Sequence, residues 1–529
     1  MTMMAPYRSQ AAPGHDGFAE LLRAEWTKFR TVRGWVIGMI LVVLATAGFG
    51  ILPHGECGSV MNGVQTTGCP APPSGPDGEW VSDEYYFVHQ PLTGNGTITV
   101  RVTSLTGKYS PNGATQEAAG NPTAGMVPGV QKWSKAGLII TANTAQGSAY
   151  AAMMVTGTHG VRMQWNYVND TPGMAGNVSA ASPRWLRLTR AGDTLTGYDS
   201  ADGTHWTQVG TATLKGLGST VQAGLFAASP DYTAENVSLG GSSGSGGPTL
   251  ATGSFDHAGV SWPATSWTGT HVGGSGRFGN SGMPVGYHQT PGALSVTGTG
   301  DIAPAVHGDG GGGKSLQDTL VGTFAGLIGV LVVAAMFVTT EYRRGLIRVT
   351  LSASPRRGRV LAAKAVVLAV VSFVAGLIAV AISIPLGLSG LRSGGIPIAP
   401  VSMLTEVRIV AGTAAVFAVV AVLALAIGTA VRRSAVAVAA VIVAVFVPEL
   451  LGTAPGLLPG GAQEWLFRLT PAAGLSIQQA FPAYPQVTAD YTANNGYYPL
   501  APWAGFAVLC AWAVAGLVLA GYLLKRRDV

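Results

Sequence analysis

The chain has 529 residues, of which 47% are hydrophobic and only 11% are charged. A soluble domain carries about a quarter charged residues, so this composition excludes a purely soluble protein and indicates a membrane protein. The formal net charge of +6 is carried by short segments beside apolar runs, which is typical of membrane orientation signals rather than of nucleic-acid binding.

The N-terminal segment 1–34 is predicted to be cytoplasmic and to contain an amphipathic helix over GFAELLRAEWTKFRTVR, residues 17–33. Apolar side chains recur there at helical spacing and basic side chains line the other faces, as in helices that lie at a membrane interface. The uncharged run 35–52 follows and is long enough for a first span, which needs about 17–25 residues. Within this run, Ala45-Thr46-Ala47 is also an A-x-A site that follows an apolar stretch, so cleavage as a signal peptide is the alternative.

A polar insert separates this run from the next apolar run, and most of the 75 Gly and 31 Pro lie in it. Residues 53–78 read as a stalk containing Cys57 and Cys69. In an oxidising, extracytoplasmic location we expect these two to form a disulfide, and two free thiols are the alternative. Residues 79–240 show strand-like alternation, for example at 97–102 and 184–190, with turn signals at Gly192-Asp193 and Asp202-Gly203. Many short strands with frequent turns predict an antiparallel sandwich.

Residues 241–316 are predicted to be a Gly-rich linker with a small β segment. GSSGSGGP at 241–248 is typical of a flexible linker. The pattern leaves open whether 249–306 form a unit of their own or pack onto the sandwich or the membrane part. GDGGGGKS at 308–315 fits the P-loop expression, but we reject it, because a P-loop needs a strand before it and a soluble helix after it.

Five further apolar runs follow, at 317–340, 360–388, 406–431, 434–451 and 502–524. Segment 341–359 is a basic connector, 452–501 is a long loop in which GLLPGGAQEWLFRL predicts a short interfacial or re-entrant helix, and 525–529 is a basic tail. Dense basic clusters alternate with connectors that lack them, so the positive-inside rule predicts six spans with both termini cytoplasmic and the sandwich extracellular. The predicted fold class is an α-helical membrane protein with six transmembrane helices plus an inserted all-β jelly-roll sandwich.

The sandwich offers aromatic side chains that could stack on a sugar ring, although aromatics at strand spacing are more often core. Neither the paired carboxylates of a glycosidase nor a metal-ligand spacing is evident in the sequence, so we expect no catalytic, metal or cofactor site. The candidate glycan contacts are Trp133, Trp165, Tyr167, Tyr198 and Trp206.

Two resemblances bear on fold and function. WSKAGLIITAN at 133–143, GVRMQWNYV at 160–168 and WLRLTRAGDTLTGYDSADGTHWTQVG at 185–210 resemble the concanavalin A-like jelly-roll domains of bacterial extracellular proteins, of the DUF1349 type. TTEYRRGLIRVTLSASPRRGRVLAAK at 339–364, LLRAEWTKFRTVRGW at 21–35 and TGTGDIAP at 297–304 resemble, in combination, actinobacterial ABC-2 type transporter permeases of the bacterial cell membrane.

The second resemblance implies a permease subunit with six spans that works as a dimer with a second permease subunit. A separate cytoplasmic ATP-binding cassette protein would bind the interfacial helix and the loop after the second span, and would drive export. The alternatives are a membrane-anchored glycan-binding or sensor protein without transport activity and, more weakly, an extracellular carbohydrate-active enzyme. The partner-coupling positions that the resemblance implies are Glu25, Trp26, Lys28, Arg30, Glu341, Arg343, Arg344, Gly345, Arg348, Pro355, Arg356 and Arg357.

Overall fold

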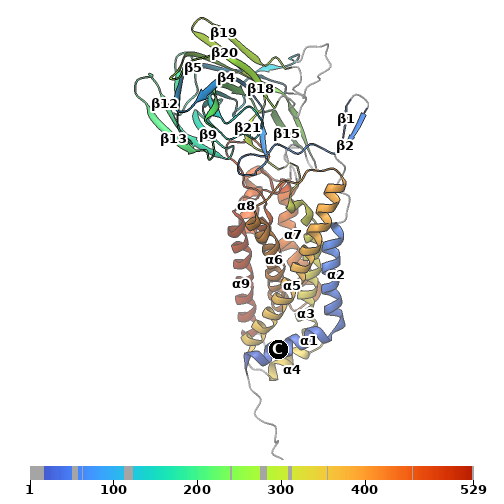
Figure 1. Cartoon of the computed structure of the whole chain (residues 1–529). Helices are drawn as coiled ribbons and strands as arrows, with labels where there is room; N and C mark the ends of the chain where they lie inside the picture. The colour runs from blue at the N-terminus through green and yellow to red at the C-terminus, as the bar shows by residue number, and fades with distance from the viewer. Residues whose placement is uncertain are drawn as a thin grey trace, which may run out of the picture.

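The structure, a computed structural model, describes residues 17–50, 58–61, 64–111, 123–238, 241–273, 283–307, 313–353, 356–454 and 457–526. A helical bundle carries a large β-structure at one end, and the chain's C-terminal end lies at the other (Figure 1). Within the described residues, five helices are long and apolar enough to cross a membrane, or up to six if the bent pair α1 and α2 counts as one span. The predicted fold class is therefore confirmed.

The helices follow the apolar runs, with short elements between them. The short helices are α1 (Phe18–Thr31), α4 (Leu346–Ala353) and α8 (Gly460–Leu469), with 3-10 turns η1 (Leu316–Leu320), η2 (Pro471–Gln478) and η3 (Ala493–Asn495). The long ones are α2 (Arg33–Phe49), α3 (Thr323–Arg343), α5 (Arg357–Ser393), α6 (Met403–Val431), α7 (Ser434–Thr453) and α9 (Pro502–Arg526).

Helix α6 is the centre of the bundle and packs against α3, α5, α7 and α9. Its Phe417, Val420 and Leu425 are almost fully buried. Gly376 of α5 lets that helix approach closely, because a Cβ atom there would lie 3.0 Å from the Phe417 ring and 3.1 Å from the Ala414 backbone. The 37 residues of α5 extend for about 55 Å at 1.5 Å per residue, which exceeds the roughly 30 Å hydrocarbon core of a bilayer. One or both ends of α5 must therefore project beyond the membrane.

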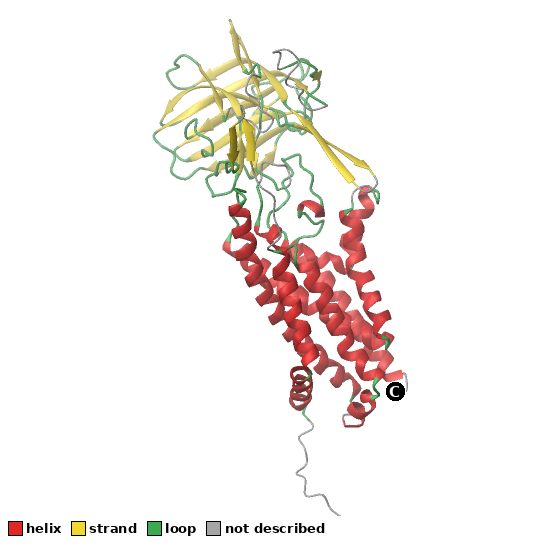
Figure 2. Ribbon diagram, turned by 90° about the vertical axis from the view of Figure 1, so that its right-hand side faces the viewer, coloured by secondary structure: helices red, strands yellow, loops and turns green. Residues whose placement is uncertain are grey.

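Two large antiparallel sheets make up most of the β-structure (Figure 2). The first has the order β10-β9-β8-β7-β14-β4-β18, with β10 (Asn169–Pro172), β9 (Val161–Trp165), β8 (Tyr150–Thr156), β7 (Lys135–Thr141), β14 (Thr220–Ala228), β4 (Tyr85–Thr93) and β18 (Thr268–Val272). The second has the order β13-β12-β11-β5-β17-β20-β19, with β13 (Thr207–Thr213), β12 (Thr194–Ser200), β11 (Arg184–Ala191), β5 (Gly96–Tyr109), β17 (Thr249–Val260), β20 (Ala293–Gly298) and β19 (Gly286–Thr290), and β6 (Val127–Pro128) also pairs with β5.

Side chains from both sheets form one apolar core, which includes Val100, Leu138 and Leu188. Strand β11 alternates buried and half-buried residues along most of its length, as expected for a strand with one face on the core. Strands β7 and β8 are buried on both faces. A second aromatic core that includes Phe87 and Tyr150 covers the other face of the first sheet.

The predicted boundary of the sandwich at residue 240 is wrong. Residues 241–247, predicted as a flexible linker, form β16 (Gly241–Gly247), which pairs with β15 (Tyr232–Ser238). The segment 249–306 supplies β17, β18, β19 and β20 to the two large sheets, and β21 (Ile302–Pro304) pairs with β3 (Val81–Asp83). The reason is that β5 is 14 residues long and needs β17 as a hydrogen-bonding partner along much of its length. Strands β1 (Gly58–Met61) and β2 (Val64–Thr67) form a separate hairpin in the stalk.

The predicted long loop 452–501 is only partly a loop. The short helix predicted within it is present as α8. Residues 471–477 of η2 are all buried, because their small and apolar side chains pack between α6, α7 and α9. The segment therefore returns into the bundle after α8, which is a correction to its assignment as extracellular loop.

Several polar contacts join the sandwich to the bundle. The Gln486 side chain donates to the Val168 carbonyl oxygen at 3.0 Å, and the His307 backbone N–H donates to the Tyr497 hydroxyl at 3.0 Å.

Lys314 and Ser315 are the last two residues of the rejected P-loop match, and both have structural partners. Lys314 pairs with Asp318 at 3.2 Å, and Ser315 forms a capping box with the same carboxylate.

Candidate functional site

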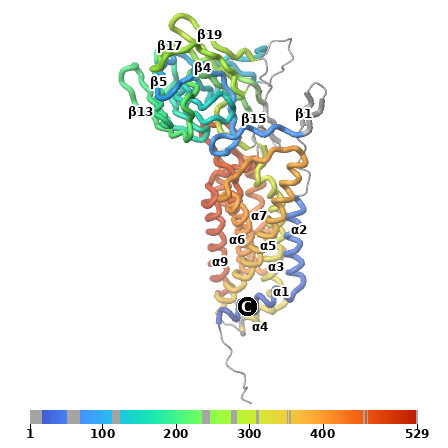
Figure 3. The backbone as a smooth tube through the Cα atoms, in the orientation of Figure 1, coloured from blue at the N-terminus to red at the C-terminus, as the bar shows by residue number. Residues whose placement is uncertain are grey.

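The end of the bundle remote from the sandwich is formed by α1, α4 and the turn between α6 and α7 (Figure 3). Helix α3 ends at Arg343, and the next turn contains Gly345 with a φ of +68°, a left-handed conformation that favours glycine. The Gly345 N–H donates to the Tyr342 carbonyl at 3.2 Å. The chain then enters α4, whose Ile347 is buried while Leu346 and Val349 are exposed. Gly345 thus allows a short amphipathic helix to begin directly after α3.

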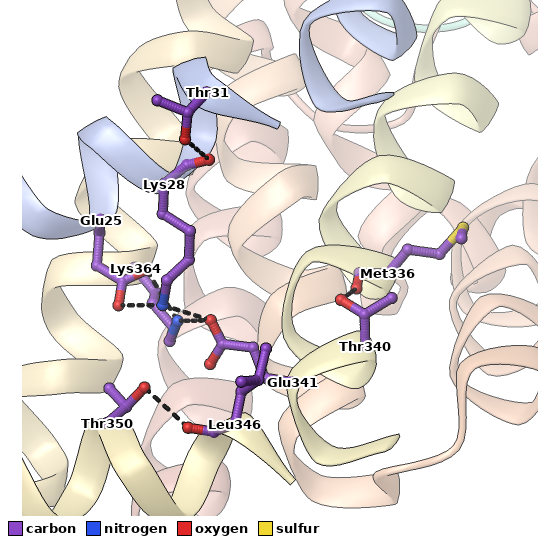
Figure 4. A network of polar contacts seen from close by, with 9 residues as sticks. All are labelled: Glu25, Lys28, Thr31, Met336, Thr340, Glu341, Leu346, Thr350 and Lys364. Atoms are coloured by element: carbon purple, nitrogen blue, oxygen red, sulfur yellow. Dashed lines mark hydrogen bonds and ion pairs between the residues drawn. The ribbon is translucent and has the colours of Figure 1, made fainter. Parts of the chain in front are cut away.

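Four charged side chains from three helices meet beside this turn (Figure 4). We call Glu25, Lys28, Glu341 and Lys364 the charge cluster. The Lys364 ammonium donates to Glu25 Oε2 at 2.8 Å and to Glu341 Oε1 at 2.7 Å. The Lys28 ammonium donates to Glu341 Oε1 at 2.6 Å and to Glu25 Oε1 at 3.2 Å. The cluster therefore ties α1 to the C-terminal end of α3 and to the N-terminal part of α5.

The charge cluster is balanced and largely buried. The side chains of Lys364, Glu25 and Glu341 are 2%, 4% and 5% exposed, and only that of Lys28 reaches 36%. Two carboxylates and two ammonium groups sum to zero, so each buried charge has a partner. Burying a charge without a partner costs several kcal/mol, whereas a paired and hydrogen-bonded charge avoids most of this cost. The balanced ion pairs of the cluster therefore hold α1 against α3 and α5.

Arginine side chains surround a groove between the α3–α4 turn and the α6–α7 turn. The groove has a volume of about 720 Å³ and is lined by Tyr342, Ile347, Arg343, Arg348, Arg432 and Arg433, among other residues. The Arg432 guanidinium lies 5.1 Å from the centre of the Tyr342 ring, a cation–π contact. Because guanidinium groups bind carboxylates bidentately, such a groove can accept an acidic protein segment.

The family is shown by comparison with known proteins. A family profile described as "ABC-2 family transporter protein" matches residues 21–529. The chain belongs to the ABC-2 transporter family. It is thus a membrane transport subunit of the ABC type, as the resemblance in its sequence implied, and a multi-pass membrane protein.

Other comparisons add little. No curated protein matches the permease. Among solved structures, a functionally unknown protein from Saccharomyces cerevisiae aligns at 15% identity and a TM-score of 0.22, covering 40% of this chain and 96% of that one. A scytalido-glutamic peptidase with a transition state analog inhibitor aligns at 10% identity and a TM-score of 0.26, covering 42% of this chain and 100% of that one. A lectin from Bauhinia forficata in complex with GalNAc aligns at 10% identity and a TM-score of 0.17, covering 33% of this chain and 83% of that one. At these TM-scores the likenesses carry no inference about the permease.

The positions predicted to couple to a partner fall into three groups in the structure. Glu25, Lys28 and Glu341 belong to the charge cluster. Arg357 donates to the Leu524 carbonyl at 2.6 Å and so fastens the end of α9, while Pro355 lies outside the described residues. The remaining positions are exposed at the end remote from the sandwich, and they are Trp26, Arg30, Arg343, Arg344, Gly345, Arg348 and Arg356.

The predicted glycan contacts of the permease are not brought together. Trp133 and Tyr167 are 4% and 1% exposed, so both are core residues and the prediction is wrong for them. The hydroxyl of Tyr167 donates to the buried Asp83 at 2.8 Å, which explains its inward position. Trp165 lies on β9 of the first sheet and Tyr198 on β12 of the second. Trp206 is half-buried, with the Arg187 guanidinium 3.8 Å from its ring centre.

The predicted disulfide stays a prediction, because Cys57 lies outside the described residues. Its expected partner Cys69 donates its backbone N–H to the Gly395 carbonyl at 3.0 Å, which joins the stalk to the end of α5.

Lys364 and Glu449 were missed as site residues by the sequence reasoning. Lys364 opens the apolar run of α5 and Glu449 interrupts that of α7. An ionisable residue within a membrane-spanning segment is a functional candidate by itself, and this signal could have identified both.

Proposed function

We propose that the chain is the permease subunit of an ATP-driven exporter, energised by a separate cytoplasmic ATP-binding cassette protein. The docking surface would be formed by α1, α4 and the arginine-lined groove beside them. The observation that carries the proposal is the charge cluster, which links the exposed surface of α1 to α3 and α5 through buried ion pairs.

The distribution of basic residues supports a cytoplasmic location for this end of the bundle. Arginines and lysines concentrate at the helix ends remote from the sandwich, and short loops rich in these residues remain on the cytoplasmic side. ATP is available on that side, and the sandwich would then be extracellular. The residues concerned are Arg343, Arg344, Arg348, Arg356, Arg357, Arg359, Arg432, Arg433, Lys525 and Arg526.

A push on α1 would reach the membrane-spanning helices by two routes. The chain bends by 75° between α1 and α2, so displacement of α1 moves the start of the first span. The charge cluster connects the same helix to α3 and α5. Because packed interfaces tend to switch between discrete arrangements, a movement of α1 would be passed to three helices at once. A second permease subunit would complete the path, as the family resemblance implies.

Copurification tests the docking surface. The full chain is coexpressed with ATP-binding cassette proteins of its source organism, purified in lipid nanodiscs, and analysed for the bound partner. We expect one of them to copurify with the wild type and to be lost when Arg343, Arg344 and Arg348 are all changed to Glu. Arg468→Glu is the matched control, because Arg468 lies on α8 near the opposite end of the bundle and forms an exposed ion pair with Glu464. Equal copurification of both variants would contradict the proposal.

A second function, binding of a cell-wall or other glycan by the sandwich, has one supporting observation. Trp206 remains partly accessible and Arg187 lies over its ring at 3.8 Å, and an aromatic ring beside a guanidinium can contact the face and the hydroxyl groups of a sugar. A glycan array probed with the full chain should then show binding that Trp206→Ala abolishes. A sensor without transport activity would be favoured by two results together: the chain binds a glycan, and changing Arg343, Arg344 and Arg348 to Glu has no effect on its function in cells.

A further inference from the structure

A cavity lies at the sandwich end of the bundle, between the start of α3, the C-terminal half of α7 and the segments η2 and η3. Its volume is about 620 Å³, within the range of about 300–1,000 Å³ that is usual for small-molecule sites. Phe324, Ile442, Phe446 and Leu450 are among the apolar residues that line it. Helix α1, which carries two residues of the charge cluster, lies at the opposite end of the bundle (Figure 1).

One carboxylate in the wall of this cavity lacks a full set of partners. Glu449 of α7 is 6% exposed. Its Oε1 accepts a hydrogen bond from the Tyr498 hydroxyl at 3.3 Å, which is a long distance for a bond of this type. Its Oε2 is buried and has no hydrogen-bond partner among the described residues. A buried carboxylate in this condition is costly, and a bound cation would remove the cost.

Two other polar side chains of the wall, Asp318 and Gln479, have partners within the protein. Asp318 pairs with Lys314 at 3.2 Å and with His307 at 3.4 Å. The Gln479 amide donates to the Phe481 carbonyl at 2.7 Å and accepts from the Tyr498 backbone N–H at 3.2 Å. Among the described residues that line this cavity, Glu449 Oε2 is the buried side-chain polar atom that lacks a hydrogen-bond partner, and a ligand can supply one.

We propose that this cavity binds an amphipathic cation, a molecule with an apolar body and one protonated amine or onium group. The apolar body would occupy the space between α3 and α7, and the cationic group would lie against Glu449. Binding requires neither ATP nor a partner protein. Only the further step, that such a cation is the exported substrate, rests on the proposed function.

The charge requirement is tested with tetraphenylphosphonium, an apolar cation, and with tetraphenylborate, an anion of similar size and shape. The full chain is placed in phosphatidylcholine nanodiscs, empty nanodiscs are subtracted, and binding is measured by equilibrium dialysis. We expect saturable binding of the cation and none of the anion. Glu449→Gln keeps the side-chain volume but removes the charge, and should weaken binding of the cation at least tenfold. Glu464→Gln, at an exposed carboxylate on α8, should leave it unchanged.

A second variant separates loss of the site from loss of the fold. Ile442→Trp keeps Glu449 but fills the apolar space, and should also abolish binding while thermal unfolding stays close to that of the wild type. Unchanged affinity in Glu449→Gln, or competition by tetraphenylborate at the same site, would overturn the proposal. No cassette protein takes part in this experiment. Failure of the cavity proposal would therefore be distinguishable from failure of the docking surface formed by α1 and α4.

Discussion

Removal of one charge from the charge cluster should release α1. Glu341→Gln preserves shape but takes away the carboxylate that both ammonium groups share through Oε1, at 2.6 and 2.7 Å. Loss of one member of a buried ion pair costs about 3–5 kcal/mol. We expect the lower end, about 3 kcal/mol, because the Lys28 side chain is 36% exposed and can be hydrated, while Lys364 keeps Glu25 at 2.8 Å.

Hydrogen exchange of the α1 amides in the full chain measures this opening. A loss of about 3 kcal/mol corresponds to roughly a hundredfold faster exchange of α1, at 1.4 kcal/mol for each factor of ten. Exchange in the sandwich strands should not change. The double variant Glu341→Gln/Lys364→Met leaves one carboxylate and one ammonium, so it should regain most of the protection.

The matched control is Glu464→Gln, which breaks the Glu464–Arg468 pair, whose side chains are 59% and 38% exposed. Exposed pairs contribute about 0–1 kcal/mol, so this variant should leave exchange in α1 as it is. Exchange of α1 in Glu341→Gln that is no faster than in the control would contradict the role given to the charge cluster. Exchange in the double variant that is faster than expected from Glu341→Gln and Lys364→Met added together would also contradict it.

Two other predictions concern the sandwich and the α3–α4 turn. Burial raises the pKa of Asp83 from 3.8 to about 6, although hydrogen bonds from Gly147 and Tyr167 act to lower it. Between these two pH values, the Asp83 carboxyl is protonated in the folded state and ionised in the unfolded chain. Stability should therefore fall as pH rises through this window, by on the order of 3 kcal/mol, and thermal unfolding should lose this slope in Asp83→Asn; the same slope in both would refute it. Gly345→Ala places a side chain on a residue with a φ of +68°, in the left-handed region, at a cost of roughly 1–2 kcal/mol. Less cassette protein should therefore copurify with this variant. Copurification equal to that of the wild type would show that the α3–α4 turn is not needed for docking.

The sequence predicted the elements whose signals are local. Apolar runs identify the long helices, because every residue of a span must be compatible with lipid. Alternation and turn residues identify the hairpin β11–β12, which closes around Gly192-Asp193 as expected. The sandwich boundary was misplaced because the Gly- and Ser-rich strands after residue 240 alternate weakly, and their position depends on pairing with distant strands.

The charge cluster could be predicted only in part. The family resemblance indicated Glu25, Lys28 and Glu341, but it did not indicate that they meet, nor that Lys364 completes them. Lys364 and Glu25 are 339 residues apart in the chain, and only the packing of α1 against α5 brings them together. The cavity at Glu449 depends in the same way on η2, which returns into the bundle from a segment predicted as a loop.

The most direct test of the central claim is the ATPase rate of the copurified cassette protein, measured with the full chain in nanodiscs. We predict that the wild type and Arg468→Glu change this rate relative to the cassette protein alone. The variant with Arg343, Arg344 and Arg348 changed to Glu should return it to the uncoupled value. An ATPase rate that the charge reversals do not alter would contradict the assignment of α1 and α4 as the surface through which ATP hydrolysis drives the permease.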